Sequence, residues 1–79
     1  MILANPFEDT KKSVLNSSAR VIDIIANRKI NQFEKVVSIV ENELQISYDK
    51  VILSLNFLFM TGALEYDRIN DILRLNNEA

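Results

Sequence analysis

One proline and one glycine, the two residue types that most often interrupt regular structure, stand near opposite ends of this chain. They are Pro6 and Gly62. The segment between them, residues 7–61, therefore contains no strong breaker and is predicted to be rich in helix. A chain of 79 residues is expected to form one domain, residues 1–79, whose core is small because chains of this size bury only about 60% of their unfolded surface.

The first helix is predicted over residues 13–27, after an extended lead-in of residues 1–12. Pro6 disfavours helical backbone at Asn5, and the lead-in ends in polar residues. Further on, apolar or small side chains recur at steps of three and four, the spacing of one side of a helix. The expected core side consists of Val14, Leu15, Ser18, Val21, Ile22 and Ile25. The expected polar side consists of Asn16, Arg20, Asp23 and Asn27.

A second helix is predicted to begin at an N-cap on Asn31 and to end near Leu44. Asn31 and Glu34 have the capping-box spacing, in which two side chains satisfy free backbone N–H groups reciprocally. Residues 29–30, just before it, are compatible with a very short strand. The apolar stripe of this helix consists of Phe33, Val36, Val37, Val40 and Leu44.

A third helix is predicted between an N-cap at Ser47 and a stop at Gly62, with Asp49 where the helix dipole favours negative charge. After Gly62 the apolar period changes to two, and the turn pair Asn70–Asp71 separates two short runs. These runs predict an antiparallel hairpin. Three helices followed by a two-stranded hairpin is the order of a winged helix-turn-helix, so we expect a mainly α fold of that type.

Few residues here suit catalysis or cofactor binding. The chain has no histidine and no cysteine, and its one glycine cannot build a phosphate-binding loop. The paired acids Glu41 with Glu43 and Asp67 with Asp71 are expected to be surface charges, because acid–base or cation chemistry needs a shaped pocket and shifted pKa values. The sequence therefore predicts a protein that is not an enzyme and has no cofactor and no metal site.

The charge balance disfavours a general nucleic-acid binder. Nine Lys and Arg face eleven Asp and Glu, and residues 48–76 contain three basic and four acidic side chains. A helix that reads DNA needs cations and amides on its exposed side, where the third helix offers only Lys50 and Asn56. Arg68, near the hairpin tip, is either a phosphate contact of the wing or a solvated side chain. A dimeric winged-helix transcriptional regulator that binds DNA stays open as the alternative function.

The third helix has a second apolar side. At about 100° per residue, its core side gathers Val51, Ile52, Leu55, Leu58 and Phe59. Leu53, Phe57 and Met60 then form a line of large apolar groups pointing away from the core. Either a protein partner covers this line, or the lead-in residues Ile2, Leu3 and Phe7 fold back over it. The predicted partner-binding residues are Leu53, Phe57, Met60, Asn56 and Lys50.

Residues 46–64 resemble the helix-then-wing segment of the small middle components of bacterial ABC-three-component systems. Tyr48 and Asp49 match the start of that segment, and the later matching positions are Leu55, Leu58, Gly62 and Leu64. The likeness is to a pattern of apolar positions over most of the chain, and the acidic run after Pro6 departs from it. The resemblance implies a non-enzymatic adaptor that links an SMC- or Rad50-like ATPase to a third component, in a system that defends bacteria against phage or foreign DNA.

The expected compartment is the cytoplasm. No cysteine is available for disulfides, and neither a leader nor a run of about 20 apolar residues is found. The chain is therefore expected to be neither secreted nor in the membrane. A homo-oligomer, in which the outer side of the third helix pairs with itself, is a further hypothesis.

Overall fold

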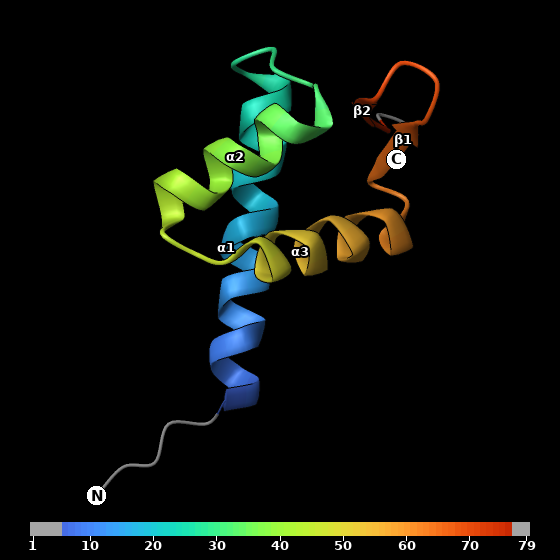
Figure 1. Ribbon diagram of the computed structural model, residues 1–79. Coiled ribbons are helices and arrows are strands. Elements are labelled where there is room, and N and C mark those ends of the chain that lie inside the picture. The colour runs from blue at the N-terminus through green and yellow to red at the C-terminus, as the bar shows by residue number, and fades with distance from the viewer. Residues whose placement is uncertain (1–5, 77–79) are drawn as a thin grey trace, which may run out of the picture.

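The computed structural model describes the backbone of residues 6–76 and the side chains of residues 11–76. Three helices are followed by one antiparallel hairpin (Figure 1). This is the mainly helical fold with a C-terminal wing that the sequence predicts. Its elements are α1 (Pro6–Ala26), α2 (Phe33–Leu44), α3 (Tyr48–Thr61), β1 (Leu64–Asp67) and β2 (Ile72–Leu75).

Helix α1 begins earlier than predicted. The extended lead-in is wrong for residues 6–12, which are helical, and residues 1–5 lie outside the described part of the chain. Pro6 is the first helical residue. A proline fits there because its missing N–H would have no acceptor within the helix and its fixed φ matches helical backbone. Pro6 restricts the residue before it and leaves the residues after it free to be helical.

The core side of α1 is rotated from the predicted one. Ser17, Val21 and Ile24 are completely buried, whereas Leu15 and Ile22, both predicted to be core, are exposed. Apolar and small side chains occupy much of the circumference of this helix, so spacing alone does not decide which part faces its neighbours. Packing against α3 and α2 decides it. The predicted polar side stays outside or half-buried.

The start of α2 also differs from the prediction. Its N-cap is Gln32, which makes no capping side-chain hydrogen bond, so the predicted cap at Asn31 is wrong. The carbonyl of Asn31 instead accepts from the backbone N–H of Leu73 at 2.8 Å, and Gln32 forms an isolated bridge with Ile72. Residues 31–32 thus pair with the hairpin before the helix begins. The short strand-like segment falls there and not at residues 29–30.

Helix α3 and the hairpin follow the prediction closely. The Ser47 hydroxyl accepts from the backbone N–H of Lys50 at 3.4 Å, and Gly62 ends the helix with a left-handed φ of 81°. The strands pair from Leu64 opposite Leu75 to Asp67 opposite Ile72, and residues 68–71 form the turn. The end of α2 at Leu44 also matches.

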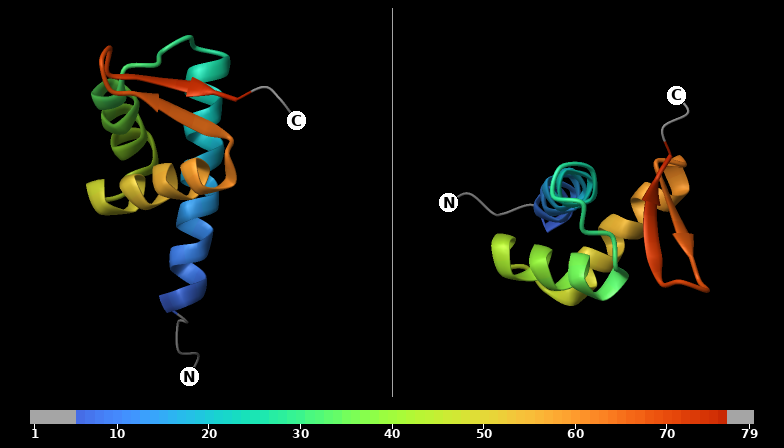
Figure 2. Two further views of the ribbon diagram at one scale, coloured as in Figure 1. Left: turned by 90° about the vertical axis from the view of Figure 1, so that its right-hand side faces the viewer. Right: turned by 90° about the horizontal axis from the view of Figure 1, so that it is seen from above.

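The core lies between α1, the bihelical unit of α2 and α3, and the inner side of the hairpin (Figure 2). It is small and rich in valine, as expected for a chain of this length. No helix among residues 6–76 is long and apolar enough to cross a membrane. The buried apolar side chains are Val21, Ile24, Val36, Val37, Val40, Val51, Leu55, Leu58, Leu64 and Leu73.

Candidate protein-docking surface

The outward side of α3 exposes three large apolar side chains, as predicted. Leu53 is 48% exposed, Phe57 40% and Met60 86%. We refer to these three residues as the α3 stripe. Asn56 is also exposed beside them, and Lys50 is half-buried at one edge. Four of the five predicted partner-binding residues are thus exposed on one side of one helix.

The stripe points outward because the opposite side of α3 is committed to the core. Val51, Leu55 and Leu58 are buried there, and Ile52 and Phe59 are half-buried. Since successive helical residues turn by about 100°, burying these positions turns Leu53 and Met60 to solvent. Both ends of α3 are fixed by capping hydrogen bonds, and these involve no residue of the stripe.

Ser54 is a buried position of α3 that the sequence prediction missed. Its side chain is completely buried, and its hydroxyl donates to the carbonyl of Lys50 at 3.0 Å. This local bond satisfies the hydroxyl, so a serine can stand in the core at little cost. Its spacing of three and four from Val51 and Leu58 is a signal that would have found it.

Positive charge is sparse around α3. Lys50 is half-buried, and Arg68 lies in the hairpin turn, which is the end of the wing distant from α3 (Figure 1). The structure therefore does not bring Arg68 together with the stripe. The remaining wing arginine, Arg74, forms an ion pair with Asp67 at 3.0 Å. Phosphate neutralisation, on which DNA affinity depends, has few groups to use here.

Hydrogen bonds to the Asp67 carboxylate stabilise the hairpin turn. One carboxylate oxygen accepts from the backbone N–H groups of Ile69 and Asn70, at 3.0 and 3.2 Å, and the other accepts from Asn70 Nδ2 and Arg74. Hydrogen bonds from Asn70, above all, lower the pKa of Asp67. Asp67 thus serves the turn, and the side chain of Ile69 is left 93% exposed at its tip.

Tyr66 and Asp71 form a second tie across the hairpin. The tyrosine hydroxyl donates to the Asp71 carboxylate at 2.5 Å, which raises the pKa of Tyr66. The Tyr66 ring also lies 5.5 Å from the Phe33 ring of α2, in a tilted arrangement. This contact joins the wing to α2. Both acids of this pair, Asp67 and Asp71, therefore accept hydrogen bonds within the hairpin.

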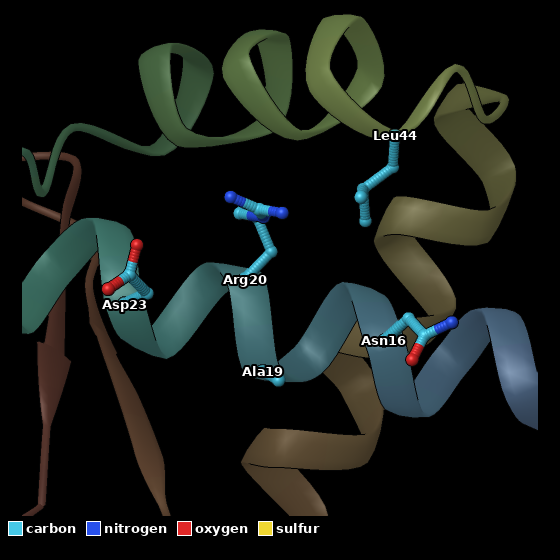
Figure 3. Close-up of a pocket in the computed structure, with 5 residues that line it drawn as sticks. All are labelled: Asn16, Ala19, Arg20, Asp23 and Leu44. Atoms are coloured by element: carbon cyan, nitrogen blue, oxygen red, sulfur yellow. The ribbon is translucent and has the colours of Figure 1, made fainter.

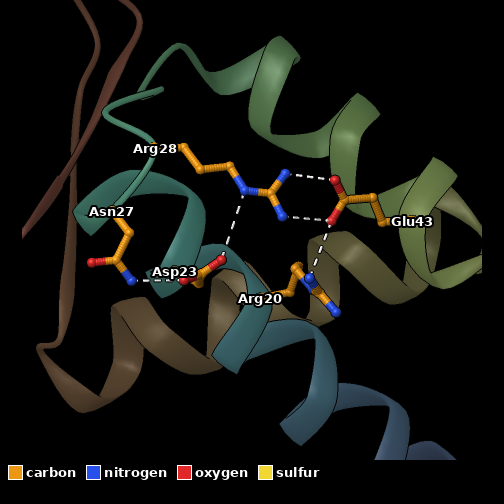
Figure 4. A network of polar contacts seen from close by, with 5 residues as sticks. All are labelled: Arg20, Asp23, Asn27, Arg28 and Glu43. Carbon is orange, nitrogen blue, oxygen red and sulfur yellow. Dashed lines mark hydrogen bonds and ion pairs between the residues drawn. The ribbon is translucent and has the colours of Figure 1, made fainter.

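An ion network joins α1, the loop that follows it and the C-terminal end of α2 (Figure 4). The guanidinium of Arg28 donates to both oxygens of Glu43, at 2.5 and 3.0 Å, while Arg20 lies 3.2 Å from the same carboxylate. Arg28 lies 3.7 Å from Asp23, which also accepts from Asn27. The hydrogen bond to Arg28 lowers the pKa of Glu43 and raises that of Arg28. Glu43 is thus an ion-pair partner between two helices.

A shallow groove of about 450 Å³ lies between α1 and the C-terminal end of α2 (Figure 3). Of its two charged groups, Arg20 faces Glu43 and Asp23 faces Arg28. Within the described part of the chain, no group of three or more Asp, Glu, His or Cys side chains is placed to hold a metal ion. The residues that line the groove are Asn16, Ala19, Arg20, Asp23 and Leu44.

No known protein family, no curated protein and no solved structure matches this chain. A functional proposal therefore rests on the surface features of the molecule.

The sequence left open that the lead-in residues Ile2, Leu3 and Phe7, and not a partner, cover the stripe. Ile2 and Leu3 lie outside the described residues, and the side chain of Phe7 does as well.

The sequence prediction also missed a second exposed apolar side, formed by Leu15, Ala19 and Ile22 of α1. Their separations of four and three residues are a signal for a helical seam, which the broad apolar arc of α1 obscured.

Proposed function

We propose that this chain is a non-enzymatic cytoplasmic adaptor that binds a protein partner through the α3 stripe. The observation that carries the proposal is the exposure of Leu53, Phe57 and Met60 on a helix whose other side packs into the core. Aromatic and methionine side chains are enriched at the centres of protein interfaces. Contiguous apolar patches on small proteins commonly mark such contacts.

We propose further that the partner is an SMC- or Rad50-like ATPase of an ABC-three-component system. The resemblance of residues 46–64 to the middle components of these systems supports this class of partner. The surface chemistry agrees with a protein partner, because the outward side of α3 combines three apolar groups with the amide of Asn56 and the single cation of Lys50. Catalysis would then reside in the ATPase and in the third component.

The test is coexpression of the chain with a coiled-coil ATPase encoded beside it, followed by titration of the purified proteins. Phe57→Asp is expected to weaken binding by about 100-fold or more, because a charge in the apolar centre of an interface is strongly unfavourable. Ile69→Asp is the matched control. It introduces the same charge at another exposed apolar residue, in the hairpin turn, and should leave the affinity within about threefold of the parent, as for a residue outside the contact.

Two outcomes would contradict the proposal. One is an ATPase complex that survives Phe57→Asp but not Ile69→Asp, which would assign the contact to the wing. The other is tight, salt-sensitive binding of the isolated chain to genomic DNA fragments that is lost on Lys50→Glu or Arg68→Glu. That second result would favour the regulator function, in which basic side chains neutralise phosphates.

A further inference from the structure

A second uncovered apolar surface lies on α1. Leu15 and Ile22 are 48% and 37% exposed, and Ala19 is exposed between them. We refer to these three residues as the α1 seam. Viewed from above in Figure 2, α2, α3 and the hairpin adjoin α1 on only part of its circumference, and no other described helix or strand covers the remainder. The separations of four and three residues are those at which one helix packs along another.

We propose that two copies of this chain associate through their α1 seams, with the two helices antiparallel across a two-fold axis. A two-fold contact requires a surface that is complementary to itself. Leu15 stands four residues before Ala19 and Ile22 three residues after it. An axis at the level of residue 18 therefore brings Leu15 of each copy to within one residue, or about 1.5 Å, of the position opposite Ile22. The small side chain of Ala19 lies near the axis and lets the helices approach closely.

One pair of charges beside the seam has the same symmetry. Lys12 and Asp23 are eleven residues apart, which places them on nearly the same side of a helix at 100° per residue. The same axis brings Lys12 of one copy to within one residue of Asp23 of the other, and the pair is repeated by symmetry. Lys12 is exposed and has no ion pair with any described residue, and the side chain of Asp23 is 43% exposed.

The size of the contact indicates a reversible dimer. With the axis at residue 18, the two helices overlap over residues 10–26, a length of about 25 Å at 1.5 Å per residue. A contact of that length lies near or below the roughly 1,200 Å² of total buried surface at which specific stable interfaces begin. Association is therefore expected to depend on protein concentration. Since the seam and the α3 stripe are on different helices, the dimer would present two stripes, and its existence does not depend on the proposed adaptor function.

The chain contains no cysteine, so single cysteine variants report proximity without background. Under mild oxidation, Ala19→Cys is expected to form a covalent dimer about tenfold faster than Leu53→Cys, because thiols held close to disulfide geometry react at a high effective concentration. Leu53→Cys is the control on another helix, since Leu53 is exposed, as Ala19 is, but lies on the α3 stripe. A mixture of Leu15→Cys and Ile22→Cys should form mixed disulfides in preference to either homodimer.

Sedimentation of the chain without cysteine is the independent measurement. The average mass should rise from 9.1 kDa toward twice that value as concentration increases, and Ile22→Asp should hold it at the monomer value with unchanged helical circular dichroism. Faster cross-linking of Leu53→Cys would assign self-association to the α3 stripe and overturn the proposal. Homodimers of Leu15→Cys and of Ile22→Cys in preference to the mixed species would overturn the antiparallel arrangement. A monomer at every concentration would overturn both the dimer and its antiparallel arrangement.

Discussion

Helices α2 and α3 form one bihelical unit, yet their outward sides differ in kind. α2 buries Val36, Val37 and Val40, and the residues it turns to solvent are polar, among them Glu34, Lys35, Ser38 and Asn42. α3 buries a comparable set and then exposes Leu53, Phe57 and Met60. Because α2 is stably packed with a polar outer side, the fold itself does not require apolar groups there. The apolar outer side of α3 therefore calls for an explanation outside the core.

The ends of the two helices differ as well. α3 has a side-chain N-cap at Ser47 and a glycine in the left-handed conformation at its C-terminus, whereas α2 has no side-chain N-cap and places Gln45 in the left-handed conformation with a φ of 54°. Left-handed backbone is unfavourable for residues other than glycine. The helix that presents the stripe is thus the one with the stronger local signals at its ends.

The largest effect is expected when leucines on the two sides of α3 are truncated to alanine and their effects on stability are compared. Leu55→Ala removes a side chain that is 1% exposed and should lower the free energy of unfolding by about 2–5 kcal/mol, through lost burial and a cavity. Leu53→Ala makes the same chemical change on the outward side and should lie within about 0.5 kcal/mol of the parent, as is usual for surface positions. Urea unfolding of both variants measures the difference, and equal losses would contradict the assignment of sides.

An intermediate effect is expected at the helix starts. Ser47→Ala should destabilise the chain by about 1 kcal/mol, because the backbone N–H of Lys50 loses its side-chain acceptor. Gln32→Asp, at the backbone position of the α2 N-cap, should stabilise by a few tenths to about 1 kcal/mol by supplying the acceptor that α2 lacks. Thermal melts at equal concentration compare the two. A gain on Ser47→Ala would mean that its long 3.4 Å contact is not a cap.

A smaller effect of opposite sign is expected where α1 packs inward. The hydroxyls of Ser17 and Ser18 are buried and have no hydrogen-bond partner in the described part of the chain, whereas that of Ser54 donates to Lys50. Ser17→Ala removes an unsatisfied polar group and should stabilise by about 0.5–1 kcal/mol. Ser54→Ala, the matched control, removes a satisfied hydroxyl and should not stabilise. Denaturant unfolding distinguishes the two, and a loss of stability on Ser17→Ala would indicate a hydrogen bond that the structure does not contain.

The smallest effect concerns the network between α1 and α2. Arg28 holds the pKa of Glu43 below its ordinary value of 4.5, so Glu43 adds stability that is complete above pH 4.5 and is lost as the pH falls through the lowered pKa. Both groups are substantially exposed, so the contribution is modest. Glu43→Gln should therefore show a smaller drop in melting temperature between pH 7 and pH 3 than the parent. An identical drop in the two proteins would show that the pair does not contribute.

The parts of the fold that the sequence predicts are those whose signals are local. Ser47 and Gly62 mark the ends of α3 with their own side chain and backbone, and the alternation after Gly62 identifies the hairpin. The start of α2 was not predictable in this way, because Asn31 is drawn into pairing with Leu73, which is distant in sequence. The core side of α1 failed for a similar reason. Which of its apolar residues become buried depends on where α3 crosses it.

The candidate site shows the same division. The exposure of the α3 stripe was predictable because α3 has two separate apolar sides, and a helix in this fold can bury only one. The α1 seam was not, because Leu15 and Ile22 lie beside the buried arc of α1, and the spacing assigned them to its core side. An apolar stripe that is separate from the core side of its helix can be identified from the sequence. One that adjoins the core side cannot.

The most direct test of the two-sided character of α3 is the free energy of unfolding of Phe57→Asp in the isolated chain. A charge on a side that faces solvent should change this free energy by less than about 1 kcal/mol and leave the helical circular dichroism intact. A charge forced into the core should cost several kcal/mol or abolish folding, because an unpaired buried carboxylate is strongly unfavourable. The first result is expected from the 40% exposure of Phe57, and the second would contradict the account by placing Phe57 in the core.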